Sequence, residues 1–247
     1  MSDKPSTMLP WPEEDFSAYG EVEAKKADRI QSYIGKVMHR NWSTIPHVTH
    51  HDDLDITEFE KRRRAWNNEN RDKKRNLLPA LVQACVYALK KYPQFNTSLS
   101  ADGETLFQKH YYNIGVAVDS PRGLLVPVVR DCDQKDIGTI ADEIARYAKK
   151  AGDQGLSMQE MSGGCFTLSS LGHIGGTMFT PIINAPEVAI LGITRTKKQF
   201  VPDADGNPVL HDLLPLSLSY DHRVINGADA ARFLRAIAKS LAEFDFS

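Results

Sequence analysis

The sequence has 247 residues, of which 41% are hydrophobic and 25% are charged, and its formal net charge is −2. This composition is that of a globular protein, and the near balance of charge disfavours nucleic acid as a partner. No segment approaches the roughly 20 apolar residues that span a bilayer, so we expect no membrane partner. The three scattered cysteines predict neither a disulfide framework nor a cysteine zinc site, which favours a cytoplasmic protein.

The N-terminal third begins with a segment that lacks any periodic pattern. Residues 1–26 contain three prolines and an acidic cluster, and they predict an extended arm. Apolar residues at helical spacing follow Asp28 and end before Pro46, which predicts a helix with Asp28 as its cap. A strand is expected over 47–56. Thr57 and Glu60 have the spacing of a capping box, which predicts the start of a charged helix.

Strand patterns dominate the rest of the chain, and helical patterns interrupt them. Helices are expected over 77–92, from 137 to near 152 and over 228–244, and strands over 96–100, 105–120, 124–131, 164–170, 187–195, 197–202 and 209–220. The helices do not alternate strictly with the strands, and hairpin turns are frequent. We therefore expect an α/β (α+β) fold, a two-layer sandwich with a mixed, mostly antiparallel sheet, over residues 27–247.

A histidine stands where the last predicted strand becomes a loop. His222 lies in the string Tyr220-Asp221-His222-Arg223, and the turn residues Asn226 and Gly227 follow. A histidine can serve as a general base because its unperturbed pKa of about 6.5 lies close to neutral pH. On its position alone, however, His222 is as well explained as a space-filling side chain, and the dense polar cluster around it favours a functional role.

A glycine-flanked loop forms the second candidate element. In the string GGCFTLSSLGHIGGT (163–177), Ser169 and Ser170 end a predicted strand, and glycines lie on both sides of them. Glycines allow a ligand to approach the backbone closely. The loop lacks the pattern of a nucleotide-binding motif and of a serine nucleophile elbow. A serine hydroxyl in this loop could instead donate to a developing oxyanion, and the alternative is a polar loop with a local side-chain turn.

Several motifs together resemble one protein family. They are HRNW and IPHVTHHDDLDIT (39–57), GVAVDSPRGLLVPVV (115–129), FTLSSLG (166–172), FTPIINAPEVAILG (179–192) and DHRVING (221–227). In this order they are similar to the catalytic domain of the dihydrolipoyl acyltransferases, the core subunits of 2-oxo acid dehydrogenase complexes, which are chloramphenicol acetyltransferase-like in fold. Within the family, the last two motifs are most similar to the acetyl-transferring subunits of bacterial pyruvate dehydrogenase complexes.

The resemblance implies a reaction and roles for three residues. An acetyl group would pass between the dihydrolipoyl thiol of a lipoyl domain and coenzyme A. His222 matches the family's general base and Ser169 its oxyanion donor, while Asn226 stands where the family more often has an aspartate. The resemblance implies that the base is oriented by its own backbone carbonyl, so the residue at 226 holds a loop and an amide is sufficient there.

The resemblance also implies the ligands and partners. Coenzyme A or acetyl-CoA is expected as a substrate near Ser170, Gly172, His173 and Arg40, and the lipoyl group is expected on a separate domain. The expected partners are further copies of the chain in a homotrimer, a larger cubic core in some family members, a lipoyl domain, and the pyruvate dehydrogenase and dihydrolipoyl dehydrogenase components. The histidines at 47, 50 and 51 lack the spacing of a metal site, so no metal is expected.

Three alternatives remain open at this stage. The acyl group could be succinyl or branched-chain, because the sequence alone does not fix acyl specificity. The chain could be a catalytically weak scaffold of the same fold, for which Asn226 is the one argument. A serine hydrolase could use Ser169, His222 and either Asp119 or Asp221, although the nucleophile elbow is missing.

Overall fold

The computed structural model describes residues 11–121 and 123–246, so the first ten residues of the predicted arm lie outside the described residues. The α-helices are α1 (Arg29–Thr44), α2 (Thr57–Glu69), α3 (Leu77–Lys91), α4 (Ile137–Asp153) and α5 (Gly227–Ala242). The strands are β1 (His47–Asp55), β2 (Thr97–Leu99), β3 (Leu106–Gln108), β4 (Ile114–Val116), β5 (Val128–Val129), β6 (Phe166–Ser170), β7 (Ala189–Ile193), β8 (Lys197–Pro202) and β9 (Pro208–Asp221). Short 3-10 turns lie at Phe16–Ala18, Arg71–Lys73 and Pro93–Asn96.

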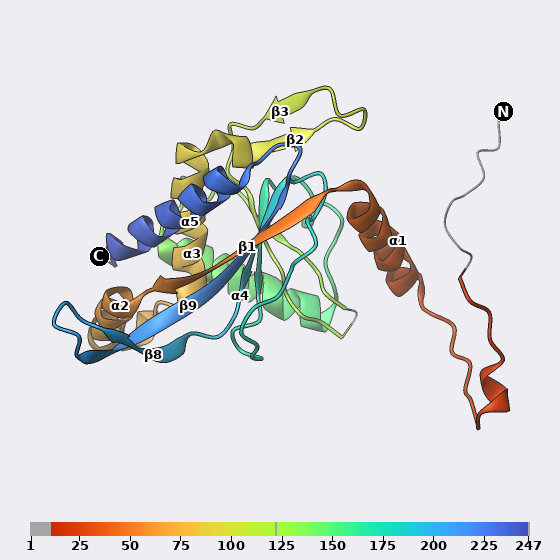
Figure 1. Cartoon of the computed structure of the whole chain (residues 1–247), viewed down its shortest axis with the longest axis horizontal. Helices are drawn as coiled ribbons and strands as arrows, with labels where there is room; N and C mark the ends of the chain where they lie inside the picture. The colour runs from red at the N-terminus through yellow and green to blue at the C-terminus, as the bar shows by residue number, and fades with distance from the viewer. Residues whose placement is uncertain (1–10, 122, 247) are drawn as a thin grey trace.

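The main sheet has seven strands in the described chain and mixes both strand directions. Its order is β1-β9-β7-β6-β4-β5, and β8 pairs with the first half of the long strand β9. The β4–β6 and β6–β7 pairs are parallel, whereas the pairs that involve β1, β5, β8 and β9 are antiparallel. The predicted mixed, mostly antiparallel sheet is therefore confirmed. A separate two-stranded hairpin of β2 and β3 completes the described strands (Figure 1).

The two faces of the sheet differ in chemistry because side chains alternate along each strand. Leu168, Leu191 and Leu218 point into the core that the sheet forms with α3 and α5. The neighbouring residues Ser169, Gly192 and Ser217 lie opposite one another across β6, β7 and β9, on the other face. This second face is lined by small and polar side chains, and it is the face on which Ser169 lies.

Helix starts follow local capping chemistry in α1, α4 and α5 and depart from the prediction in α2. Asp28 accepts a hydrogen bond from Gln31 N and forms a capping box with it, and Asp136 caps α4. The predicted capping box of Thr57 and Glu60 is wrong, because α2 already includes Thr57 and the side chain of Ile56 makes no cap bond. The Thr57 hydroxyl instead donates to Asp55 and accepts from the backbone of β9.

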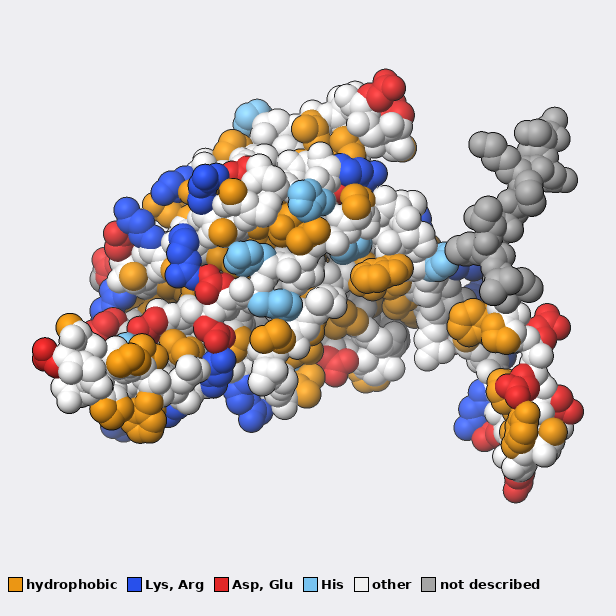
Figure 2. Space-filling model, viewed as in Figure 1, with side chains coloured by type: hydrophobic (Ala, Val, Ile, Leu, Met, Phe, Trp, Pro, Cys, Tyr) orange, Lys and Arg blue, Asp and Glu red, His pale blue; other side chains and the backbone are white. Residues whose placement is uncertain are grey.

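The helix α1 and the residues before it project from the rest of the chain (Figure 1). Asn41 is the one buried residue of α1, and hydrophobic side chains are exposed along this part, as the orange atoms of Figure 2 show. The exposed large hydrophobic side chains between residues 11 and 44 are Trp11, Phe16, Tyr19, Val22, Ile30, Tyr33 and Trp42. Such a concentration of apolar surface is typical of a segment that another subunit covers.

The longest predicted strand is divided in the structure. The run 105–120 contains β3 and β4, which belong to different sheets, and residues between them are not in strands. The other strands and helices of the prediction are present: β8 has the predicted bounds, β9 is longer by one residue at each end, and the rest have shorter or shifted ends. None of the helices in the described residues is long and apolar enough to cross a bilayer.

Candidate functional site

His222 lies in the turn that follows β9, and its side chain is exposed. Its backbone N–H donates to Pro46 O at 3.1 Å, and its ring lies 5.8 Å from that of Tyr220 between centroids. The ring makes no hydrogen bond with another described residue. The preceding Asp221 is 2% exposed, and its carboxylate accepts hydrogen bonds from Arg223, at 2.7 Å for the closer pair. The imidazole is thus accessible to a ligand, and Asp221 is engaged elsewhere.

Asn226 begins the last helix. Its Oδ1 accepts from the backbone N–H of Asp229 at 2.9 Å, and its Nδ2 donates to the Asp229 carboxylate at 2.9 Å. These are the contacts of an N-cap, a position that Asn and Asp fill about equally well. Asn226 therefore stabilises the junction between the start of α5 and the turn that contains His222.

Ser169 is 8% exposed and lies near the end of β6, on the face opposite the helices. Gly192 lies opposite it on β7, and an added Cβ at Gly192 would stand 2.7 Å from the ring of Phe179. Ser217 follows in the same row on β9, and His51 Nδ1 is 2.9 Å from its Oγ. The Ser169 hydroxyl makes no hydrogen bond with another described residue, so it is available to a ligand that reaches this face.

The two candidate catalytic residues are far apart within one chain. Ser169 is level with Ser217 across two strand pairings, and His222 is five residues after Ser217, just beyond the end of β9. At about 3.3 Å per residue and about 4.8 Å between strands, the separation is about 16 Å along the strands and about 10 Å across them. They lie toward opposite ends of the strands because β6 and β9 run in opposite directions. One chain therefore does not present both side chains to one reacting carbonyl.

Three of the four predicted coenzyme A residues line one cavity. Ser170, Gly172 and His173 border a cavity of about 340 Å³, together with apolar residues of α3 and the segment Ile193–Thr196. The guanidinium of Arg195 donates to the carbonyl oxygens of the 172–174 loop and holds it in place. Arg40 lies apart from this cavity, on α1, where it donates to Asn41 Oδ1.

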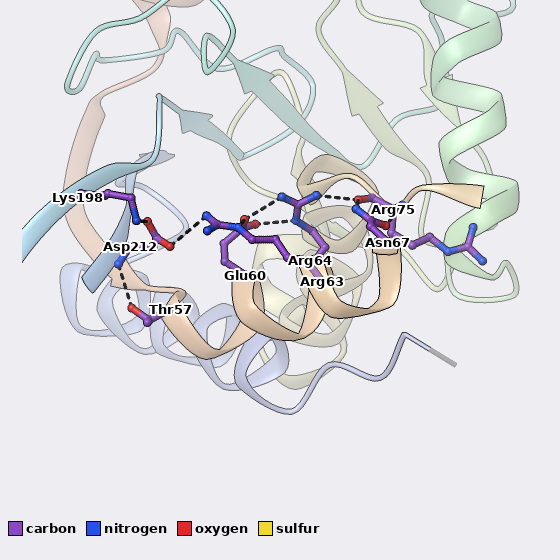
Figure 3. Close-up of polar contacts among 8 residues, drawn as sticks. All are labelled: Thr57, Glu60, Arg63, Arg64, Asn67, Arg75, Lys198 and Asp212. Carbon is purple, nitrogen blue, oxygen red and sulfur yellow. Dashed lines mark hydrogen bonds and ion pairs between the residues drawn. The ribbon is translucent and has the colours of Figure 1, made fainter. Parts of the chain in front are cut away.

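A charged cavity adjoins the first one. It measures about 530 Å³ and shares Leu77 and Thr196 with its neighbour. Glu60, Arg63, Arg64, Lys198 and Asp212 line it, so three cations face two carboxylates. Figure 3 shows these side chains pointing toward one another.

Ion pairs order this charged cavity. The Arg63 guanidinium lies 2.7 Å from Glu60, and this hydrogen bond raises the pKa of Arg63. Arg64 lies between the two carboxylates, 3.4 Å from Glu60 and 3.3 Å from Asp212, and Lys198 lies 3.0 Å from Asp212. The side chains of Arg64 and Lys198 are 56% and 58% exposed. Arg63 and Arg64 belong to the basic run 61–64, and the partner Asp212 on β9 is distant from this run in the chain.

The histidines of β1 make separate contacts. His47 bonds to the backbone of Ile45 and Ile183, while His51 pairs with Ser217. The pale-blue side chains in the middle of the face in Figure 2 lie over this strand. Among the residues that the structure describes, no three His, Cys, Asp or Glu side chains are placed to hold a metal ion.

Glu187 is a buried carboxylic acid that sequence reasoning missed. It is 5% exposed, and burial raises its pKa to about 7. The Thr167 hydroxyl donates to Glu187 Oε2 at 2.6 Å, and an added Cβ at Gly164 would stand 2.7 Å from Oε1. The contact ties the segment before β7 to β6, two residues before Ser169.

The chain is similar in sequence to a known family of acyltransferases. Residues 19–246 match the family model described as 2-oxoacid dehydrogenases acyltransferase (catalytic domain). The chain is 51% identical over 240 residues to the dihydrolipoyllysine-residue acetyltransferase component of the pyruvate dehydrogenase complex of Cupriavidus necator, and 51% identical over 237 residues to that of Pseudomonas aeruginosa. These matches cover 96% and 95% of the chain but 43% of each relative, so the chain spans less than half of their length.

The fold of the chain is similar to those of solved acetyltransferase structures. A dihydrolipoamide acetyltransferase of Azotobacter vinelandii, studied for the role of a serine, a histidine and an asparagine in its catalytic mechanism, aligns with a TM-score of 0.90 and 48% identity, covering 96% of this chain and 98% of that one. The cubic core of the pyruvate dehydrogenase multienzyme complex aligns with the same score, identity and coverage. Chloramphenicol acetyltransferase, 14% identical with a TM-score of 0.58 over 83% of this chain and 94% of that one, shares the fold.

Proposed function

Because the chain belongs to the 2-oxoacid dehydrogenase acyltransferase family, we propose that it transfers an acetyl group between a dihydrolipoyl thiol and coenzyme A in a pyruvate dehydrogenase complex. The observation that carries the proposal is the exposed ring of His222, without a hydrogen-bond partner among the described residues and four positions before Asn226. The histidine and the asparagine studied in the Azotobacter vinelandii enzyme are also four positions apart.

His222 acts as the general base in this proposal. Proton transfer from a thiol of pKa about 8.5 to an imidazole of pKa about 6.5 is uphill by about two units, or about 2.7 kcal/mol. The thiolate of coenzyme A then attacks the carbonyl carbon of the acetyl-dihydrolipoyl thioester. Ser169 donates its hydroxyl proton in a hydrogen bond to the oxyanion of the tetrahedral intermediate. Collapse of the intermediate releases the dihydrolipoyl sulfur, which takes the proton back from the imidazolium.

The active site is formed between two chains of a homotrimer. Ser169 and His222 are about 16 Å apart along the strands of one chain, so Ser169 of one chain meets His222 of the next. The exposed apolar side chains of α1 and of the residues before it support the same assembly, because a second copy of the chain would cover them. Association of trimers into a cubic core, as in the related complex, is a further part of the proposal.

Coenzyme A occupies the two adjoining cavities. The pantetheine arm lies in the cavity bordered by Ser170, Gly172 and His173, at the end of β6 that carries Ser169. The phosphates lie in the charged cavity, where the cations exceed the carboxylates and Arg64 and Lys198 are exposed to a ligand. Arg40 lies on a different part of the chain, and its predicted role in coenzyme A binding stays a prediction.

The complex supplies the other partners. We assign the lipoyl group to a lipoyl domain, and we place the chain with the pyruvate dehydrogenase and dihydrolipoyl dehydrogenase components in the cytoplasm. Cys85, Cys132 and Cys165 are buried and unpaired, which supports a reducing compartment. Burial raises the pKa of Cys165 to about 12 and that of Cys132 to about 11, so these thiols do not compete with the substrate thiols.

The proposed activity is tested by an assay of acetyl transfer from acetyl-CoA to free dihydrolipoamide, in which the released coenzyme A is measured. The assay uses the chain as it is, because free dihydrolipoamide replaces the lipoyl domain. Transfer that is saturable in both substrates is expected. Absence of transfer by the folded chain would contradict the proposal.

Lys198→Gln is expected to raise the KM for coenzyme A about threefold to tenfold and to leave kcat within about twofold. The substitution removes a partly exposed cation and frees the charge of Asp212 to repel the phosphates, an effect of ~1 kcal/mol. Steady-state kinetics at low and high salt measure the KM for coenzyme A, and the difference in KM between the variant and the unsubstituted chain should shrink at high salt. Lys197→Gln is the matched control, because Lys197 pairs with Asp53 outside the charged cavity. Equal KM values for the two variants would exclude this location for the phosphates.

A further inference from the structure

Both ring nitrogens of His47 are held by the backbone. Nδ1 lies 2.9 Å from Ile45 O, and Nε2 lies 2.9 Å from Ile183 N. A backbone N–H can only donate, so Nε2 must accept and the ring proton must lie on Nδ1. His47 is therefore a neutral imidazole with one fixed tautomer, which joins the start of β1 to the segment before β7.

The same corner of the chain holds the backbone of His222. Pro46, the residue before His47, accepts the backbone N–H of His222 at 3.1 Å through its carbonyl oxygen. His47 itself is the register partner of Asp221 in the β1–β9 pairing. The position of the His222 backbone thus depends on the corner formed by residues 45–47, and the His47 ring fixes that corner.

A second side chain strengthens the far end of this link. Asn41 is 0% exposed, and its Nδ2 donates to Ile183 O at 2.9 Å. Ile183 is therefore held through its N–H by His47 and through its C=O by Asn41. Trp42 packs beside the His47 ring with centroids 5.5 Å apart. Because Ile183 is itself 0% exposed, it provides a rigid anchor for the ring.

We propose that His47 is a positioning residue for the general base: by bonding Ile45 and Ile183 it fixes the corner whose Pro46 carbonyl holds the His222 backbone. The inference rests on the proposed function, since it assumes that His222 is the base. A displacement of a catalytic group by about 1 Å can cost about 10²-fold in rate. Loss of the His47 contacts is therefore expected to act on kcat, because coenzyme A binds in cavities that do not include this corner.

The first test compares three variants in the acetyl-transfer assay. His47→Ala removes both ring bonds and is expected to lower kcat about tenfold or more, with the KM for coenzyme A within about twofold. His47→Gln, whose amide oxygen can accept from Ile183 N–H, is expected to recover kcat to within about threefold of the parent. His50→Gln is the control on the same strand and should match the parent. If His47→Ala does not assemble, His47→Asn, which keeps only the Ile45 contact, takes its place.

Either of two kinetic results would overturn the inference. One is a parental kcat in His47→Ala, and the other is a His47→Gln variant no faster than His47→Ala. Thermal unfolding and gel filtration of each variant show that the compared proteins are folded and of equal size. A role in folding alone would change the unfolding temperature and leave kcat per folded chain unchanged.

The second test is a double-mutant cycle with His222→Ala. If His47 acts through His222, the double variant His47→Ala/His222→Ala is no slower than His222→Ala alone. Effects that multiply would show that His47 acts independently of His222, against the proposal. A His222→Ala variant as active as the parent would instead refute the proposed function, so the two failures are distinguishable.

Discussion

His222→Ala is expected to lower kcat for acetyl transfer at least about 10²-fold, because it removes the base that accepts the thiol proton. The side chain is exposed and makes no hydrogen bond within the described chain, so the variant should unfold at the parental temperature. Single-turnover kinetics separate the chemical step from product release. Rescue of the rate at high pH, where the thiolate forms without a base, would support the role. A variant with parental kcat at neutral pH would contradict it.

Asn226→Asp serves as the control for this experiment. Asp fills an N-cap position about as well as Asn and can still accept from Asp229 N, although it loses the hydrogen bond that Asn226 Nδ2 donates to the Asp229 carboxylate. The variant is expected to keep kcat within about threefold, in contrast to the 10⁴-fold effect of the reverse change in a protease whose base depends on a carboxylate. A large gain in kcat would show that the base of this chain lacks a carboxylate helper, which would favour the scaffold interpretation.

Ser169→Ala is expected to lower kcat about 10²-fold or more, with the KM values for both substrates within about threefold, because the oxyanion exists only in the tetrahedral intermediate. Ser169 faces the polar side of the sheet with Gly192 and Ser217, whereas Ser170 borders the coenzyme A cavity on the other side of β6. Ser170→Ala should therefore act mainly on the KM for coenzyme A.

The comparison of the two serines matters because the sequence interval and the face of the sheet favour different serines. In the Azotobacter vinelandii enzyme, the interval between the serine and the histidine that were studied equals the interval from Ser170 to His222. The interval from Ser169 to His222 is one position longer. The face of the sheet favours Ser169. A loss of kcat in Ser170→Ala with a parental Ser169→Ala would reverse the assignment.

Helices and buried strands could be predicted from the sequence where one pattern persists. The 3.6-residue period after Asp28 and the alternation before His222 are continuous, and α1 and β9 follow them. The run 105–120 failed because alternation does not reveal which partner a strand pairs with, and the chain passes from one sheet to another within it. The capping box at Thr57 failed because a local bond to Asp55 and a long-range bond from the backbone of β9 occupy its hydroxyl.

Some residues of the candidate site could likewise be predicted from the sequence, and others could not. His222, Asn226 and Ser169 stand in local motifs, so the sequence identifies them. His47 suggested at most a metal ligand, because its bond to Ile183 spans 136 positions of the chain. Glu187 and the ion pairs of Asp212 likewise depend on contacts across strands that no local pattern records. What could not be predicted is the set of long-range contacts that orient the recognised residues.

The distance between Ser169 and His222 within one chain makes the two-chain active site the central claim. His222→Ala and Ser169→Ala chains carrying different affinity tags can be co-expressed in equal amounts and assayed for acetyl transfer as the assembled mixture. Each mixed trimer then contains one interface with both native side chains, so random assembly should restore about a quarter of the parental activity, although each variant alone is nearly inactive. A mixture no more active than the mean of the two single variants would contradict the claim.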